Sequence, residues 1–254
     1  MSYPADILST RAVIRHGSYA IIPPTGLVNN VVPGIEKCRV SIVASPKMGA
    51  GFVQYIIEAG KDGGTITAFG AQPGVECFIF CICGNGEVGI GNERRELTEG
   101  GYAYAPAGVG MRFKNTGENT LKLILYKQRY IPWDDYDARV VFGNANNMDY
   151  RIYEDMENVL IKDLLPTDLG FDMNFHILSF IPGGCHPFIE THVQEHGAYV
   201  LSGEGAYLLC EQWTMIKKGD FIWFGPFTTQ GAYGVGREPF TYVYSKDCNR
   251  DQAI

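Results

Sequence analysis

The sequence has no cluster of basic residues longer than a pair and no long apolar segment. Its 254 residues carry 21 Lys and Arg against 28 Asp and Glu, a net charge of −7. An acidic chain without a basic stripe is poorly suited to bind phosphate backbones. No stretch approaches the roughly 20 apolar residues that span a bilayer. These absences predict a protein with neither nucleic-acid nor membrane partners.

Features of a secreted protein are also lacking. The first residues, MSYPADILSTR, have no basic region followed by an apolar run, the pattern of a secretory leader. The seven Cys are odd in number and irregularly spaced, unlike a disulfide framework. We therefore expect reduced thiols and a cytoplasmic location. Cys77, Cys81 and Cys83 alternate within CFIFCIC as in a buried strand, and their spacing is unusual for zinc, so we interpret them as small apolar side chains.

Helical periodicity is nearly absent, and EDMENVLIKDLL is the best candidate for a short helix or a linker strand. Short runs rich in Val, Ile, Tyr and Phe instead recur between Gly, Pro and Asn residues. Examples are FVQYIIE, FIFCIC, LKLILY, AYVLS, FIWF and FTYVYS. This pattern is typical of strands joined by turns, so the predicted fold class is all-β.

Two stretches of the chain share a layout. In the first half, ECFIFCICGNGEV ends in a G-x-G turn and is followed by LTEGGYAYAPAG. In the second half, HGAYVLSGEGAY ends in its own G-x-G turn before IKKGDFIWFGPF. Such internal repetition indicates a tandem duplication. With a polar connector before the boundary, we predict domains at 1–145 and 146–254.

Histidine is scarce, with five residues, and two of them lie close to a carboxylate in FIETHVQEHG. In extended backbone Glu190 and His192 point to one face, and His196 can join them from an adjoining turn or strand. Imidazoles and a carboxylate without a thiolate favour Mn or Fe over structural zinc. The alternative is a surface loop with two unrelated His residues.

The wider spacing resembles the cupin family, which implies a bicupin of two tandem cupin (jelly-roll) β-barrels. Five positions follow the first cupin motif, with its first His and its Glu exchanged: Gly184, Glu190, His192, His196 and Gly203. The second motif maps onto Gly219, with Gly225 at its Pro position and Phe227 at its second Gly position. Gln230 stands where the motif has its last His, and its carbonyl oxygen can still ligate a metal.

The first half has the better second motif but no imidazole at its sites. Its matching positions are Gly100, Pro106, Gly108 and Asn115. Met111 occupies the His position, and TAFGAQPGVECF contains no His. We therefore expect a metal-free N-terminal domain that buries surface and helps to build a homo-oligomer, although Glu76 could line a pocket. His16, His176 and His186 receive no role.

Near the C-terminus, FTYVYSKD alternates, so Tyr242, Tyr244 and Lys246 share one face of a strand. Lys246 lies either at a rim, with its ammonium in water, or inside as a cation for an anionic substrate. Tyr207, just after the second G-x-G turn, is either a core aromatic or a phenol aimed at the ligand.

Longer strings closely resemble the bicupin family of (S)-ureidoglycine aminohydrolases. They include LGFDMNFHILSF, IETHVQEHGAYVLSG, KKGDFI, YGVGR and YSKDCNRD, with AVIRHG, VVPG and LYKQRYIP in the first half. The resemblance implies one Mn(II) per chain, held by Glu190, His192, His196 and Gln230. It also implies substrate contacts from Gln230, Tyr242 and Lys246, with Tyr207 as a further candidate.

The implied reaction converts (S)-ureidoglycine and water to (S)-ureidoglycolate and ammonia, in purine and allantoin catabolism. Lys246 is the expected cation for the substrate carboxylate or proton donor to the leaving amine, and Glu190 is a possible base. Glu195 is less suited to act as the base, because it lies at an odd position of the chain and Glu190 at an even one. Two alternatives stay open. A cupin dioxygenase or isomerase acting on a small polar acid is distinguished by oxygen consumption, and a non-catalytic binding protein by its indifference to metal removal.

Overall fold

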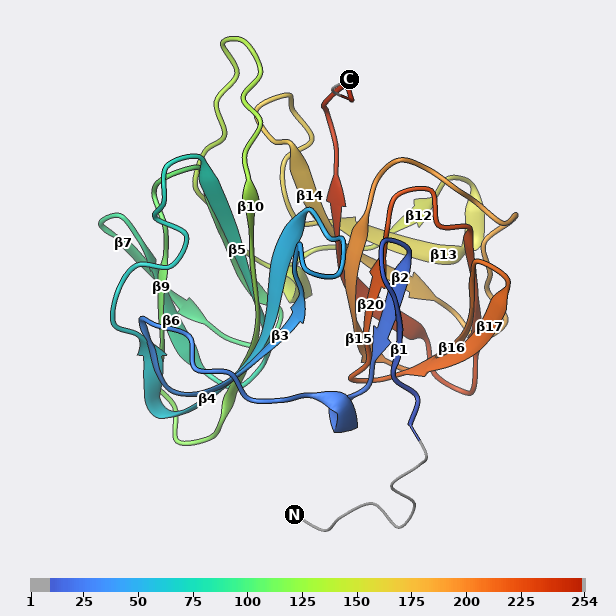
Figure 1. Ribbon diagram of the computed structural model, residues 1–254, viewed down its shortest axis with the longest axis horizontal. Helices are drawn as coiled ribbons and strands as arrows, with labels where there is room; N and C mark the ends of the chain where they lie inside the picture. Colours follow the sequence, from blue (N-terminus) through green and yellow to red (C-terminus); the bar gives the residue numbers. More distant parts are fainter. Residues whose placement is uncertain (1–9, 253–254) are drawn as a thin grey trace.

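The computed structural model describes residues 10–252 (Figure 1). Its regular structure consists of strands and two short 3-10 helices, η1 (Pro24–Gly26) and η2 (Ala145–Asn147), which confirms the all-β prediction. Within 10–252 no helix is both long and apolar enough to cross a membrane. The stretch 1–9, on which the prediction of no leader largely depends, lies outside the described residues.

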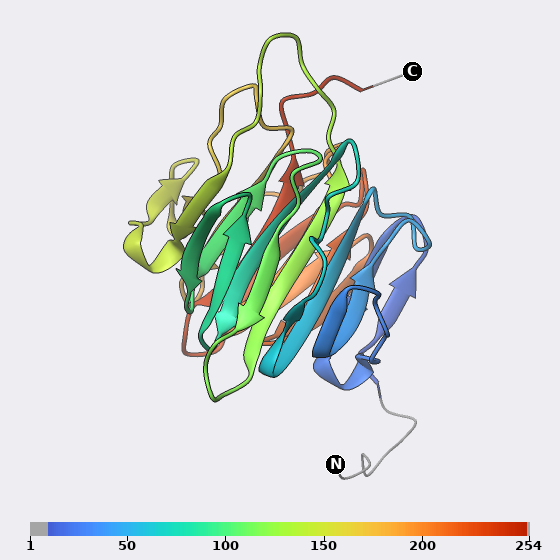
Figure 2. The ribbon, with the colours of Figure 1, turned by 90° about the vertical axis from the view of Figure 1, so that its left-hand side faces the viewer.

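The strands form two lobes that lie side by side (Figure 1). The first lobe is one nine-stranded sheet in the order β11-β8-β5-β10-β4-β9-β6-β7, with β3 paired to β4. Its strands are β3 (Ile35–Ala44), β4 (Phe52–Thr65), β5 (Val75–Cys83), β6 (Gly86–Ile90), β7 (Glu93–Leu97), β8 (Gly101–Ala105), β9 (Arg112–Asn115), β10 (Leu121–Arg129) and β11 (Val141–Asn144). Figure 2 shows this lobe in front, with its long strands running side by side.

The second lobe combines an eight-stranded sheet, β1-β2-β18-β15-β20-β14-β13-β12, with a three-stranded sheet, β17-β16-β19. The early strands of the eight-stranded sheet are β1 (Val13–Arg15), β2 (Tyr19–Ile22), β12 (Arg151–Tyr153), β13 (Met156–Asp163) and β14 (Met173–Phe180). The remaining strands of this lobe are β15 (His196–Ser202), β16 (Glu204–Leu209), β17 (Gln212–Lys217), β18 (Phe221–Phe224), β19 (Gln230–Val235) and β20 (Phe240–Asp247).

The segment that offered a short helix or a linker strand forms strand β13. It pairs antiparallel with β12 and β14, and its Val159 and Ile161 side chains are buried in the second lobe. The two-residue spacing of these apolar side chains fits a strand, and cross-strand pairing on both sides supplies the backbone hydrogen bonds.

The first strands of the chain belong to the second lobe. Strand β2 pairs with β18, Tyr19 opposite Phe224 and Ile22 opposite Phe221. Just before β1, the Arg11 guanidinium makes a two-pronged ion pair with Asp220 at 2.5 and 2.7 Å. The division of the chain at 145 stays a prediction. Through these contacts β1 and β2, from the start of the chain, join the eight-stranded sheet of the second lobe.

Three apolar clusters form the core: one inside each lobe and one between them. Strand β5 serves two of them because its side chains alternate. Cys77 and Cys81 are buried inside the first lobe, as the sequence predicted for small apolar residues. The same prediction was wrong for Cys83, which is exposed because it is the last residue of β5. Phe78 and Phe80 point into the layer between the lobes, where Phe78 stacks on Phe175 of β14 with ring centroids 3.8 Å apart. The lobes therefore share a continuous aromatic layer.

Glu76, suggested as a pocket residue, is fully buried. Its carboxylate accepts hydrogen bonds from the Tyr104 hydroxyl and, at 2.8 Å, from the Gln128 amide. Burial is the largest cause that raises the pKa of Glu76 well above its usual value, and the Asp172 carboxyl adds to it. Glu76 is therefore part of a packed polar cluster.

Candidate metal centre

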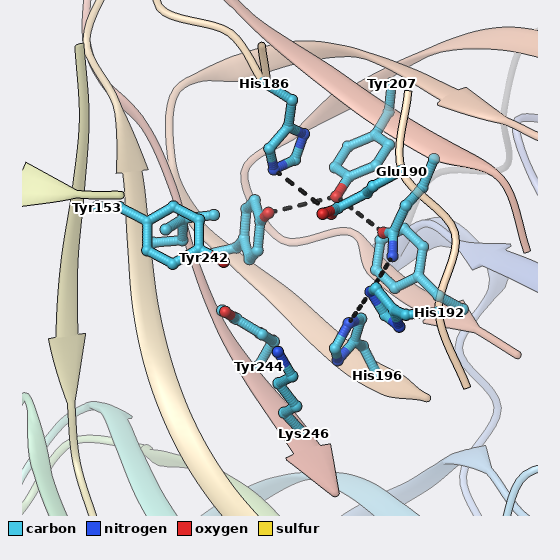
Figure 3. A pocket seen from close by; sticks show the side chains of 12 residues that line it. Tyr153, His186, Glu190, His192, His196, Tyr207, Tyr242, Tyr244 and Lys246 are labelled. Carbon is cyan, nitrogen blue, oxygen red and sulfur yellow. Dashed lines mark hydrogen bonds and ion pairs between the residues drawn. The ribbon is translucent and has the colours of Figure 1, made fainter. Parts of the chain in front are cut away.

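A small cavity opens inside the second lobe, among side chains from β12, β14, β15, β16, β18, β19 and β20 and from the loop 181–195 (Figure 3). Its volume is about 30 Å³, room for an ion with one or two waters. The lining residues are Tyr153, Leu178, His186, Glu190, His192, His196, Tyr207, Phe224, Gln230, Tyr242, Tyr244 and Lys246.

The loop 181–195 is attached to β19 and to the turn before it. Glu190 and Gln230 exchange two backbone hydrogen bonds of 2.9 Å, and the Phe227 N–H donates to the His192 carbonyl at 2.7 Å. These bonds hold Glu190 and His192 in extended backbone beside Gln230, the first residue of β19. Both side chains reach the cavity, as the alternation of Glu190 and His192 predicted.

The two imidazoles face each other through their Nε2 atoms. Nδ1 of His192 lies 2.9 Å from the Gln194 carbonyl, and Nδ1 of His196 lies 2.9 Å from the Ser245 carbonyl. A carbonyl can only accept, so each Nδ1 carries the hydrogen and each neutral ring presents a bare Nε2. The two Nε2 atoms are 3.3 Å apart. Facing lone pairs at this distance repel unless a cation lies near both, and this arrangement fits a metal ion.

The Gln230 amide completes this group. Its Nε2 is 3.0 Å from His192 Nε2, and its Oε1 accepts from the Tyr207 hydroxyl at 3.4 Å. The two ends of an amide exchange by a half-turn, which would bring Oε1 to the imidazoles. Burial lowers the pKa of His192 and lowers that of His196 far more, so both rings are neutral and able to ligate.

Glu190 stands apart from the imidazoles. Its Oε1 is 3.8 Å from Nε2 of His186, on the far side of the cavity (Figure 3). Across 10–252 no three His, Cys, Asp or Glu side chains lie close enough together to hold a metal. The structure thus brings together His192, His196 and Gln230, and Glu190 would have to turn from His186 to join them.

His186 is a cavity residue that the sequence left without a role. Its Nδ1 accepts from the Ala232 N–H at 3.0 Å, so a neutral ring points its Nε2–H at the Glu190 carboxylate. The signal available in the sequence was nearness, because His186 lies four residues before Glu190 and six before His192 in the loop 181–195. Tyr153 is a second lining residue that the sequence did not single out.

Strand β20 supplies one row of the cavity: Tyr242, Tyr244 and Lys246. Lys246 therefore points inward and not toward the rim (Figure 3). The Tyr242 hydroxyl lies 3.3 Å from that of Tyr207, which is fully buried. Burial raises the pKa of both phenols, so they stay protonated and keep a hydrogen to donate.

Two other groups lie away from the cavity. The Glu195 carboxylate accepts from Trp223 Nε1 at 2.9 Å and from the Gly51 N–H at 2.7 Å, so it links the second lobe to the first. His176 Nδ1 lies 2.8 Å from Asp163. Neither residue lines the cavity. For Glu195 this agrees with the sequence expectation, because Glu195 lies at an odd position whereas Glu190 and His192 lie at even positions.

A scan against protein-family models found no match. The chain is 47% identical to the (S)-ureidoglycine aminohydrolase of Escherichia coli (strain K12), over 99% of this chain and 97% of that protein. The crystal structure of protein Ylba from E. coli superposes with a TM-score of 0.89 at 45% identity, covering 100% of both chains.

A cupin 2 conserved barrel domain protein from Leptotrichia buccalis superposes with a TM-score of 0.63 at 16% identity, over 92% of this chain and 99% of that one, which shows the cupin fold. The full-length identity to the E. coli enzyme decides the family: the chain belongs to the (S)-ureidoglycine aminohydrolases and is an enzyme.

Proposed function

We propose that this chain is an Mn(II)-dependent hydrolase that converts (S)-ureidoglycine and water to (S)-ureidoglycolate and ammonia, in purine and allantoin catabolism. The observation that carries the proposal is the pair of Nε2 atoms 3.3 Å apart beside the Gln230 amide. We further propose a cytoplasmic bicupin that assembles as a homo-oligomer, with a small-molecule substrate and no nucleic-acid or membrane partner.

The proposed ligands are Glu190, His192, His196 and Gln230, one ion per chain. Two imidazoles, a carboxylate and an amide oxygen form a hard N/O set without thiolate, which suits Mn(II). When bound, the ion supplies Lewis acidity and a fixed template for the substrate's oxygen and nitrogen atoms. His186 lies beside Glu190, and the Gln194 and Ser245 carbonyls fix the two imidazole tautomers.

Lys246 is the one Lys or Arg among the described residues that line the cavity. We assign its ammonium to the substrate carboxylate, which fixes the orientation of the reacting carbon. The amine leaves as ammonia when the C–N bond breaks and a C–O bond to water forms. Glu190 would take one proton from the attacking water, and a proton from Lys246 or a phenol would reach the departing amine.

The phenols of Tyr207 and Tyr242 are assigned to the ureido group. Both are protonated, and their hydroxyls lie 3.3 Å apart beside Gln230. A substrate carbonyl oxygen can accept from one of them, while the surrounding rings exclude bulk water. Because the cavity holds only about 30 Å³, side chains at its mouth must move to admit the substrate.

The decisive experiment measures ammonia release and product chirality with freshly made ureidoglycine. Metal-stripped enzyme should be near the uncatalysed rate, and Mn(II) should restore fast release with a single enantiomer. Ammonia release at the background rate with racemic product under both conditions would overturn the proposal. An oxygen electrode run in parallel should show no uptake, and stoichiometric uptake would favour the dioxygenase alternative.

A further inference from the structure

A second cavity lies between the two lobes, separate from the metal centre. Its volume is about 380 Å³, and none of its lining residues also lines the metal centre. The first lobe contributes Phe80 and Ile82 of β5, and the second contributes Ile177 of β14 and Leu201 of β15. We call this space the interlobe cavity. It is large enough for a small organic molecule.

The charge around the interlobe cavity is positive, although the whole chain has a net charge of −7. Lys122, Lys162 and Lys218 line it, against a single carboxylate, Glu99. Lys122 is 3.8 Å from Glu58, and both Lys218 and Glu99 are exposed. The local excess of cations therefore favours an anionic occupant.

Lys162 is the cation that most needs a partner. It is 91% buried, the complement of its 9% exposure, and among residues 10–252 no carboxylate lies within 4.0 Å of its Nζ. Its ammonium donates to the Ala145 carbonyl at 2.8 Å and lies 4.1 Å from the centre of the Tyr150 ring. One carbonyl satisfies one of the three ammonium hydrogens. The exposed Asp149 carboxylate raises the pKa of Lys162 against the larger lowering by burial, but it makes no ion pair with Lys162, so the ammonium can bind a further anionic acceptor.

Part of the remaining wall is apolar or aromatic, and Asn146 and Thr241 add polar groups to it. Phe80, Ile82, Ile177 and Leu201 provide hydrocarbon surface, and the Tyr199 ring lies under the Lys122 ammonium at 5.7 Å. A cavity of this kind pairs a buried cation with a hydrophobic wall, and it is best filled by a ligand with a charged end and an apolar body.

We infer that the interlobe cavity is a binding site for a small organic carboxylate with an apolar or aromatic body, its carboxylate paired with Lys162. The bound body would contact Ile177 and Thr241 on β14 and β20. The next residues on these strands, Leu178 and Tyr242, line the metal centre on the opposite face. The occupant would therefore contact the reverse side of two strands that build the catalytic cavity.

Benzoate is the probe, measured by titration calorimetry on the intact enzyme, with benzyl alcohol and inorganic phosphate as controls. Benzoate should bind with a Kd in the millimolar range, as expected for a fragment of that size. The alcohol lacks the charge and phosphate lacks the apolar body, so both should bind at least about tenfold more weakly. Absence of benzoate binding up to on the order of tens of millimolar would overturn the inference.

Variants locate the bound probe. Lys162→Met should weaken benzoate binding about 10- to 100-fold, as for loss of a charged hydrogen bond. Leu201→Trp, at a half-buried wall position, should abolish binding by filling the cavity, and it keeps the test decisive if Lys162→Met does not fold. Lys246→Met should leave benzoate affinity unchanged. Loss of affinity in Lys246→Met but not in Lys162→Met would place benzoate in the metal centre and refute the interlobe site.

Discussion

The two lobes use the same backbone pairing for opposite purposes. In the second lobe, an isolated bridge joins Glu190 to Gln230, with two hydrogen bonds of 2.9 Å. In the first lobe, an isolated bridge joins Phe69 to Met111, with two hydrogen bonds of 2.8 Å. Polar side chains on this pairing line a cavity, and apolar side chains on it fill a core. The side chains, and not the backbone pairing, therefore distinguish the two lobes at this position.

A lysine appears on the last long strand of each lobe. Lys127 of β10 pairs with Cys77, and Lys246 of β20 lines the same cavity as His196. Cys77 and His196 are at matching positions, since each lies seven residues before the first glycine of a G-x-G turn, Gly84 or Gly203. The Lys127 ammonium lies 5.3 Å from the centre of the Phe69 ring. In the second lobe, the positive charge of Lys246 opposes the burial that raises the pKa of Glu190. The first lobe thus offers a matched control for the proposed catalytic cation.

Replacing His192 by Ala should have the largest effect of the changes proposed here, and that effect is on metal binding. The variant makes the second lobe resemble the first, because it removes an imidazole from the proposed ligands. Loss of one of four ligands should weaken Mn(II) binding by more than the roughly 10- to 100-fold expected for an outer-shell change. Metal analysis after exhaustive dialysis should find the variant nearly metal-free and the wild type with one equivalent. A full equivalent in the variant would refute the ligand assignment.

Lys246→Met should lower turnover by about a hundredfold or more, comparable to loss of an oxyanion donor. The Met stem keeps most of the packing while the charge is removed, so melting temperature and metal content should stay constant. Lys127→Met is the control and should retain wild-type turnover. Steady-state formation of (S)-ureidoglycolate by Lys246→Met within about threefold of wild type would place Lys246 outside the catalytic machinery.

Met111→Ala tests the first lobe as a structural element. Met111 is 1% exposed inside that lobe. Its truncation should reduce the free energy of unfolding by about 2 to 4 kcal/mol through cavity formation. Bound metal should be unchanged at temperatures where the variant is folded. Denaturant titration and metal analysis on the same sample check both parts, and loss of metal from a folded variant would contradict the division of roles.

Asp163→Asn should have the smallest effect and distinguishes a structural His from the metal-site pair. Burial keeps His176 neutral by lowering its pKa, so its Nδ1–H donates a hydrogen bond to Asp163. This hydrogen bond is the largest cause that lowers the pKa of Asp163 from 3.8 to about 2. The folded pKa lies below the unfolded one, so the stabilisation is present above pH 3.8 and is lost as pH falls toward 2.

At about 1.4 kcal/mol per pKa unit the shift corresponds to about 2.4 kcal/mol, and solvent screening of this partly exposed carboxylate reduces the expected contribution at neutral pH to about 1 to 2 kcal/mol. The free energies of unfolding of wild type and Asp163→Asn, measured by denaturant titration, should differ by this amount at pH 7. They should converge near the acidic end of that pH window. A difference that stays constant with pH would mean that the Asp163 charge does not contribute, and metal content should be unchanged throughout.

The local patterns of the sequence were sufficient for the strands and for much of the candidate site. Alternation placed Cys77 and Cys81 in a buried strand and put Tyr242 and Lys246 on one face. It could do so because a strand repeats every two residues, so a face can be predicted from a few neighbours. Glu190 and His192 reach one cavity for the same reason, since they are two residues apart in extended backbone.

Contacts between distant segments were decided only by the tertiary structure. No local pattern pairs Tyr19 with Phe224, or directs Lys246 into the cavity instead of the rim. The Ala232 N–H fixes the His186 tautomer across 46 residues, and Lys162 faces a cavity whose other wall lies in the first lobe. Such contacts depend on how whole sheets pack, because burial and hydrogen-bond partners are set by surfaces that come together only when the two lobes fold.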